Sequence, residues 1–190
     1  AGLRELAPRS EEPTALVMGE ISKNPLLNVC RLLNEEGAEY LVVGAWAMIL
    51  NGLIRATEDV DILIAENPSN YQKVIDALSR LPDGAASELV PEDFAENSFV
   101  KIADDIEVDV GIRAWTVTYA EAHPNAQRTT VEGVEIPYLS ICDLIRSKQT
   151  HRDQDRVDLE NLIRLRKEVL DYSLLEIFWC YGFLIRRYVR

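Results

Sequence analysis

The chain has 190 residues, of which 47% are hydrophobic and 27% are charged, enough for one domain with a substantial core and a helical extension. Its formal net charge of −12 repels nucleic acid unless basic side chains gather locally. Only two histidines are present, which argues against a histidine-rich zinc centre. The three cysteines are scattered and no signal-peptide pattern opens the chain, which predicts a cytoplasmic protein with reduced thiols.

The pattern of the chain predicts three parts. Residues 1–22 carry proline and charge, which predicts a flexible tail, and residues 23–168 form the main domain. Residues 169–190 include an apolar segment, 174–185, of about 12 residues. A membrane span needs roughly 20 residues, so we expect a helix that packs on the domain or forms a homodimer contact. Attachment at a membrane interface is the alternative.

Alternating helices and strands are predicted within the main domain, in an α+β arrangement. In chain order we expect a helix from Asn24 to Gly37, a buried strand at 40–43, a helix at 45–52, a strand that carries Asp59 and Asp61, a helix at 67–82, strands at 99–102 and 106–110, a strand at 130–138, and helices at 140–150 and 153–168.

The pair Asp59 and Asp61 is the most informative feature of the chain. On a β-strand, residues two apart point to the same face, so the two carboxylates lie side by side. Like charges at this separation repel, and a divalent cation removes the conflict. Carboxylate oxygens suit Mg²⁺. The alternative interpretation is a solvated pair at a strand edge or in a turn.

Three stretches, Val42–Ala47, Gly52–Asp61 and Lys148–Asp158, resemble the small prokaryotic nucleotidyltransferases of the DNA polymerase beta-like superfamily. Abortive-infection and toxin–antitoxin proteins are among the members of that group. The resemblance covers about residues 25–168. It implies a nucleotidyltransferase-like mixed β-sheet of about four to five strands flanked by helices. It also implies a magnesium-dependent enzyme that moves an NMP from an NTP, such as ATP, to a hydroxyl acceptor and releases pyrophosphate.

The same resemblance assigns the carboxylates. Asp59 and Asp61 would bridge two Mg²⁺ ions, one of which arrives with the NTP. Asp109 alternates with apolar residues on the strand at 106–110. It would hold the ion that activates the acceptor hydroxyl and help to remove its proton. Glu107 shares the strand face of Asp109 and is the alternative third ligand.

Gly44 and Ala45 are the first candidates for triphosphate binding. Gly44 stands where a strand turns into a helix, and helix starts offer unpaired N–H groups that glycine lets a phosphate approach. A plain turn residue is the alternative. The family usually has Gly or Ser at the next position. Ala45 keeps the N–H group, so the fold is unaffected but the tightness of triphosphate binding is left open.

Further along the chain, basic side chains are candidates for phosphate contacts. Arg55 suits bidentate phosphate binding, and Thr57 either contacts the site or only braces the loop. Lys148 and Arg152 are four residues apart on the predicted helix and share a face. By the resemblance, Lys148 meets the β- and γ-phosphates while Arg152 and Asp155 hold it in place. The alternative is an exposed ladder of salt bridges.

The sequence leaves the acceptor open among a tRNA end, a protein side chain and a small molecule. A second hypothesis is a catalytically inactive nucleotide-binding or interaction module on the same fold, which the departure at Ala45 favours slightly. The presence of all the expected carboxylates favours the enzyme. A third hypothesis is a small-molecule (antibiotic-type) nucleotidyltransferase. A toxin-like role with a cognate antitoxin follows only from family analogy.

Overall fold

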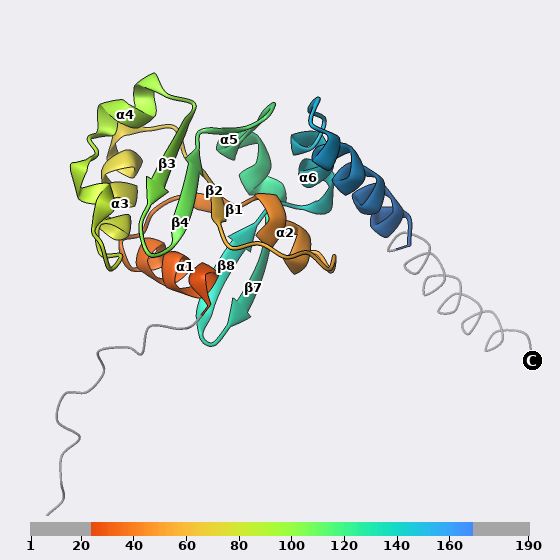
Figure 1. Ribbon diagram of the computed structural model, residues 1–190, viewed down its shortest axis with the longest axis horizontal. Helices are drawn as coiled ribbons and strands as arrows, with labels where there is room; N and C mark the ends of the chain where they lie inside the picture. Colours follow the sequence, from red (N-terminus) through yellow and green to blue (C-terminus); the bar gives the residue numbers. More distant parts are fainter. Residues whose placement is uncertain (1–23, 169–190) are drawn as a thin grey trace, which may run out of the picture.

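A six-stranded mixed sheet in the order β3-β4-β2-β1-β8-β7 organises residues 24–168, the part of the chain that the computed structural model describes (Figure 1). Its strands are β1 (Tyr40–Val42), β2 (Val60–Ile64), β3 (Phe99–Ala103), β4 (Glu107–Gly111), β7 (Gln127–Val131) and β8 (Val134–Tyr138). β2 pairs in parallel with β4 and antiparallel with β1, and β1 pairs in parallel with β8. The α+β fold class is confirmed, with more strands in the sheet than expected.

Helices cover the sheet and close its ends. They are α1 (Pro25–Glu35), α2 (Gly44–Leu50), α3 (Pro68–Leu78), α4 (Pro91–Glu96), α5 (Tyr119–Ala122) and α6 (Ile141–Ser147), with short 3-10 turns η1 (Ala85–Glu88) and η2 (His123–Asn125). A further helix spans 153–168. α1 packs against α3 and β8, whereas α2 packs against β2 and α6. In Figure 1 the 153–168 helix lies beside α6, at the opposite end of the molecule from α3 and α4.

The first helix forms as the sequence predicts. Asn24 caps it by accepting a hydrogen bond from the Leu26 N–H at 3.0 Å, and Pro25 fills the first turn. Its apolar side chains are buried, with Val29, Cys30 and Leu33 at 0% exposure. Burial of such an apolar stripe supplies most of the stability of a helix of this length.

The segments after β4 include two differences from the expected secondary structure. The strand predicted at 130–138 is the β7–β8 hairpin, which turns at Glu132 and Gly133, both with positive φ. Its first strand is polar and largely exposed, so it lacks the apolar alternation that marks a strand in the sequence. The helix predicted at 140–150 ends at Ser147.

Two predicted segments lie outside the described residues: the tail at 1–22 and the apolar helix at 169–190 with its proposed dimer contact. Within residues 24–168, no helix has both the length and the apolar character that crossing a membrane requires.

Candidate functional site

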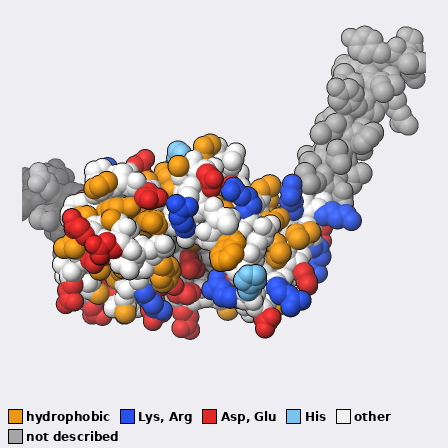
Figure 2. Space-filling model, turned by 90° about the horizontal axis from the view of Figure 1, so that it is seen from above, with side chains coloured by type: hydrophobic (Ala, Val, Ile, Leu, Met, Phe, Trp, Pro, Cys, Tyr) orange, Lys and Arg blue, Asp and Glu red, His pale blue; other side chains and the backbone are white. Residues whose placement is uncertain are grey.

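A pocket of about 910 Å³ opens where β2, β4, the start of α2 and the 148–155 segment meet. The structure brings all the predicted site residues to the wall of this one pocket. They are Gly44, Ala45, Arg55, Thr57, Asp59, Asp61, Asp109, Lys148 and Arg152. Figure 2 shows a hollowed face of the molecule on which acidic side chains lie recessed among Lys and Arg side chains. Their functional roles remain predictions.

Asp61 and Asp109 lie directly opposite one another on neighbouring parallel strands. The register of β2 with β4 pairs Asp61 with Asp109. The alternating residues of these strands are in the core: Val60 and Val108 are 0% exposed. Because side chains alternate along a strand, burial of the apolar set turns both aspartates toward the pocket.

Asp59 precedes β2 by one residue and sits in a bend rather than in the strand. Its carboxylate accepts a hydrogen bond from the Thr57 hydroxyl. Thr57 therefore braces the loop that carries Asp59, which is the structural alternative that the sequence left open.

Electrostatic repulsion couples the three carboxylates. Burial raises the pKa of Asp61 to about 6, and the charges of Asp59 and Asp109 add to the effect, while Lys148 and the Ala45 N–H oppose it. Burial also raises the pKa of Asp109, which Lys101 lowers and Asp59 raises. The three groups therefore concentrate negative charge at one end of the pocket.

The donor chemistry of this cluster fits a hard divalent cation. Oδ1 of Asp109 is buried and accepts no hydrogen bond from the described residues. An unpaired buried carboxylate oxygen beside two further carboxylates is suited to Mg²⁺. No three Asp, Glu, His or Cys side chains within residues 24–168 already converge tightly enough to form a metal-binding group.

Gly44 fixes the position of Asp61. Its φ of +57° lies in the left-handed region, and a β-carbon built on it would stand 2.0 Å from Oδ2 of Asp61. The Val43 N–H donates to the Asp61 carbonyl at 3.0 Å, and the Ala45 N–H donates to the Asp61 carboxylate. The amide of Ala45 is thus engaged by Asp61, a contact that the sequence analysis did not anticipate.

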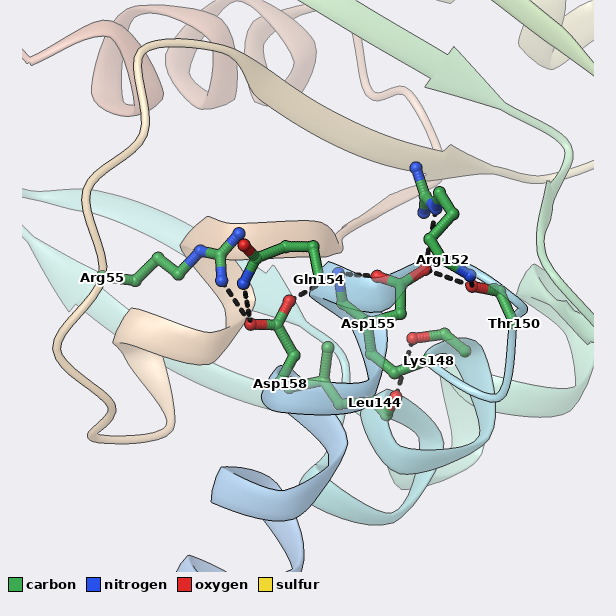
Figure 3. Close-up of polar contacts among 9 residues, drawn as sticks. Arg55, Leu144, Lys148, Thr150, Arg152, Gln154, Asp155 and Asp158 are labelled. Atoms are coloured by element: carbon green, nitrogen blue, oxygen red, sulfur yellow. Dashed lines mark hydrogen bonds and ion pairs between the residues drawn. The ribbon is translucent and has the colours of Figure 1, made fainter.

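Lys148 lies in a buried network of ion pairs at the side of the pocket (Figure 3). Its Nζ is 2.9 Å from Asp155 Oδ1 and 3.1 Å from Asp158 Oδ2. The Lys148 side chain is only 12% exposed, and those of Asp155 and Asp158 are 2% and 1% exposed. The alternative of an exposed salt-bridge ladder therefore does not hold for Lys148.

Arg152 and Arg55 join this network from opposite ends. Arg152 Nε is 2.8 Å from Asp155 Oδ2, and Arg55 pairs with Asp158. Burial opposes ionisation of Asp155, but hydrogen bonds from Thr150, Lys148 and Arg152 together hold its pKa below the usual carboxyl range.

The expected helical spacing of Lys148 and Arg152 is wrong. Lys148 is the C-cap of α6, and Arg152 precedes the 153–168 helix, so the two residues do not share a helix face. They meet instead because both contact Asp155 across the 148–152 connection. The 148–158 stretch is a loop and a helix start, not one continuous helix.

The sequence analysis gave no role to several residues of this region. Asp158 lies three residues after Asp155 on the same helix, and that spacing could have placed both on one face. Trp115 and His151 also line the pocket, and no sequence signal singled them out. Glu107, the alternative third ligand, has a side chain that is 53% exposed and pairs with Lys101 at 2.7 Å. It does not line the pocket.

No protein-family model matches the chain, and no curated protein matches its sequence. Solved structures do match. One, from Thermotoga maritima and provisionally described as a nucleotidyltransferase, is 16% identical with a TM-score of 0.45 and covers 75% of this chain and 89% of its own. Another, an antigenic nucleotidyltransferase-like protein from Paracoccidioides brasiliensis, is 17% identical with a TM-score of 0.46 and covers 85% of this chain and 88% of its own.

Proposed function

We propose that this chain is a magnesium-dependent nucleotidyltransferase that moves an NMP from an NTP to a hydroxyl acceptor and releases pyrophosphate. One observation carries the proposal: Asp61 and Asp109 lie in register on adjacent parallel strands, in the same pocket as Lys148 and Arg152. Nucleotidyl transfer requires carboxylates that bind metal ions and cationic side chains that bind phosphate.

The carboxylates take the metal side of the reaction in this proposal. Asp59 and Asp61 would hold Mg²⁺, part of which would arrive with the NTP, and Asp109 would contribute a ligand on the acceptor side. The bound metal supplies charge neutralisation at the α-phosphate and an acidified acceptor hydroxyl. Asp109 would orient that hydroxyl and accept its proton.

Lys148 would stabilise the negative charge that develops on the departing pyrophosphate. An ammonium group has three N–H donors. Nζ donates one to Asp155 and also forms an ion pair with Asp158, so it still has N–H groups for a phosphate oxygen. Lys148 also acts electrostatically on Asp61, which places it within range of the carboxylate cluster.

The two arginines flank Lys148 and extend the phosphate contact. Arg152 uses Nε for Asp155, and its side chain is 76% exposed, so its two amino groups can reach a phosphate. Arg55 lines the pocket and contacts Asp158. The main-chain turn at Gly44 and Ala45 borders the same space.

The pocket volume and the charge of the chain bear on the acceptor. A space of about 910 Å³ holds an NTP together with a small acceptor group. The net charge of −12 disfavours a large RNA. We propose a small molecule or a protein side chain as acceptor, with a tRNA end as the competing outcome. A toxin-like role would follow if a cellular target loses function when labelled.

A labelling assay tests the proposal. The chain is incubated with Mg²⁺ and each α-³²P-labelled NTP in a cell extract, and label on any acceptor is measured. Asp109→Asn should lower labelling by about 100-fold or more, since it removes the base and a ligand. Glu107→Gln is the matched control, because Glu107 is on the same strand but outside the pocket. Equal losses in both variants would contradict the assignment of Asp109.

A second candidate function is a nucleotide-binding module without turnover. The engagement of the Ala45 amide by Asp61 favours it, because that N–H is then not offered to a triphosphate. ATP binding by calorimetry that survives Asp109→Asn, together with no labelling by the unmodified chain in any extract, would establish this candidate and exclude the transferase.

A further inference from the structure

Trp115 occupies a turn position that tryptophan rarely adopts. It is the first residue of the two-residue turn between β5 (Arg113–Ala114) and β6 (Val117–Thr118), with a φ of +57°. This position in a tight hairpin favours glycine, and a bulky side chain there is strained. Its side chain is nonetheless 50% exposed, so the core does not gain from the ring. A strained aromatic kept at the surface indicates a binding role.

The Trp115 side chain lies at the candidate site. It lines the same pocket as Asp61, Asp109 and Lys148. The His151 ring meets the Trp115 ring edge-on, with centroids 6.3 Å apart and planes at 83°. That contact constrains the orientation of the indole. His151 directly precedes Arg152, so the aromatic pair adjoins the cationic side of the pocket.

We propose that Trp115, oriented by His151, is a stacking platform for a nucleobase. The inference deepens the proposed function by locating the base, and it rests on that function only in taking the ligand to be a nucleotide. A flat, uncharged π-face next to phosphate-binding cations matches the two ends of a nucleotide. Stacking on an aromatic ring accepts any base, because every base has a π-face. The base belongs either to the NTP or to a nucleotide acceptor.

A binding comparison on the full chain tests the platform. ATP and inorganic tripolyphosphate, each with Mg²⁺, are titrated by calorimetry into the unmodified chain, Trp115→Gly and Trp115→Phe. The glycine variant suits the positive φ, so loss of binding is not loss of fold. It should weaken ATP binding roughly 5- to 150-fold and leave tripolyphosphate unchanged. The phenylalanine variant keeps a ring and should stay within about threefold.

A second arm separates the two sources of the base. A short adenylate RNA and an abasic oligonucleotide of the same length replace ATP and tripolyphosphate. If Trp115→Gly weakens ATP binding and Trp115→Phe does not, the platform holds the base of the NTP. If only RNA binding is weakened in this way, the platform holds the base of an acceptor. The control is Val131→Ala, which changes an exposed apolar residue on the β7–β8 hairpin outside the pocket. It should change neither ATP binding nor RNA binding.

Three results overturn the platform: no binding of ATP or RNA by the unmodified chain, unchanged binding of both in Trp115→Gly, or an equal loss for tripolyphosphate. These outcomes are independent of turnover. Ring-dependent ATP binding without any labelling rejects the transferase and keeps the platform. Labelling that survives Trp115→Gly, with ATP and RNA binding unchanged, keeps the transferase and rejects the platform.

Discussion

Gly44 and Asp61 approach one another so closely that a β-carbon on Gly44 would lie 2.0 Å from the Asp61 carboxylate oxygen Oδ2. Any side chain at position 44 must therefore displace Asp61 and also adopt a φ of +57°. Gly44→Ala should cost about 2–4 kcal/mol in the free energy of unfolding and abolish nucleotidyl transfer. Urea denaturation and the labelling assay measure the two effects.

Gly37 provides the matched control for this change. It has a similar φ of +64°, but a β-carbon there would meet nothing within 4 Å. Gly37→Ala should therefore show only the backbone strain, about 1–2 kcal/mol, and keep full activity. If the two variants lose the same stability and Gly44→Ala remains active, the contact with Asp61 does not constrain the site.

The raised pKa of Asp61 predicts a pH-dependent loss of stability. In the folded chain this pKa is about 6, against an ordinary value of 3.8. The unfolded chain thus releases the proton more readily, and stability falls as the pH rises from about 4 through 6. The full effect is about 3 kcal/mol or less. Asp61→Asn should be more stable than the unmodified chain at pH 7.5 and similar to it at pH 4, by urea denaturation at both values.

Magnesium should reverse this destabilisation. A cation that binds the folded carboxylate cluster stabilises the fold by mass action. We expect millimolar Mg²⁺ to raise the thermal midpoint of the unmodified chain at pH 7.5 and to have little effect at pH 5, where Asp61 is mostly protonated. Asp61→Asn should respond weakly at both values. A midpoint that ignores Mg²⁺ at pH 7.5 would argue against a metal site at these residues.

Asp158 should matter more for stability than any exposed acid on its helix. It is 1% exposed and compensates the charges of Arg55 and Lys148. Removing one partner of a buried ion pair leaves the others uncompensated, so Asp158→Asn should cost about 3–5 kcal/mol. Asp153→Asn is the control: that side chain is 99% exposed and lies 3.8 Å from Arg156. It should change stability by less than about 0.5 kcal/mol.

Activity gives a second readout of the same pair of variants. Since Asp158 contacts Arg55 and Lys148 but does not itself line the pocket, its loss should raise KM for the NTP more than it lowers kcat. Asp158→Glu, which keeps the charge, should recover part of the affinity. Equal stability of Asp158→Asn and Asp153→Asn in denaturant would show that the buried network does not hold the 153–168 helix to the pocket.

Local rules in the sequence predicted those parts of the fold that depend on local patterns. Pro25 and the apolar stripe that follows it predicted α1, and the alternation of Val108 and Val110 with Asp109 predicted both β4 and the direction of that carboxylate. These signals suffice because one face of each element is buried.

Specific side-chain contacts and turn geometry account for what the sequence did not predict. The break between Ser147 and the next helix contains neither glycine nor proline, and the contacts of Lys148 and Thr150 with Asp155 fix it. The strained turn at Trp115 has no local signal either. Such features depend on how individual side chains pair in the folded chain, which the periodicity of apolar residues does not encode.

Stability should also depend on Asn70, a buried polar side chain that does not line the pocket. It is 1% exposed, and its Nδ2 donates to the carbonyls of Glu39 at 3.0 Å and Ala65 at 3.2 Å, while its Oδ1 accepts from the Glu39 N–H at 2.7 Å. It thereby ties the residue before β1 to the residue after β2. Asn70→Ala removes these hydrogen bonds and takes from the Glu39 N–H its acceptor, which should cost about 2–4 kcal/mol.

Urea denaturation measures this loss against Gln72→Ala on the same helix. Gln72 is exposed and its side chain bonds only to Asp76 among the described residues. Gln72→Ala should therefore change the free energy of unfolding by no more than about 0.5 kcal/mol. Asn70→Asp should be worse at pH 7.5 than at pH 4, because burial penalises the ionised carboxylate. A loss below 0.5 kcal/mol for Asn70→Ala would mean that water replaces the amide, and that the strand ends stay together without this side chain.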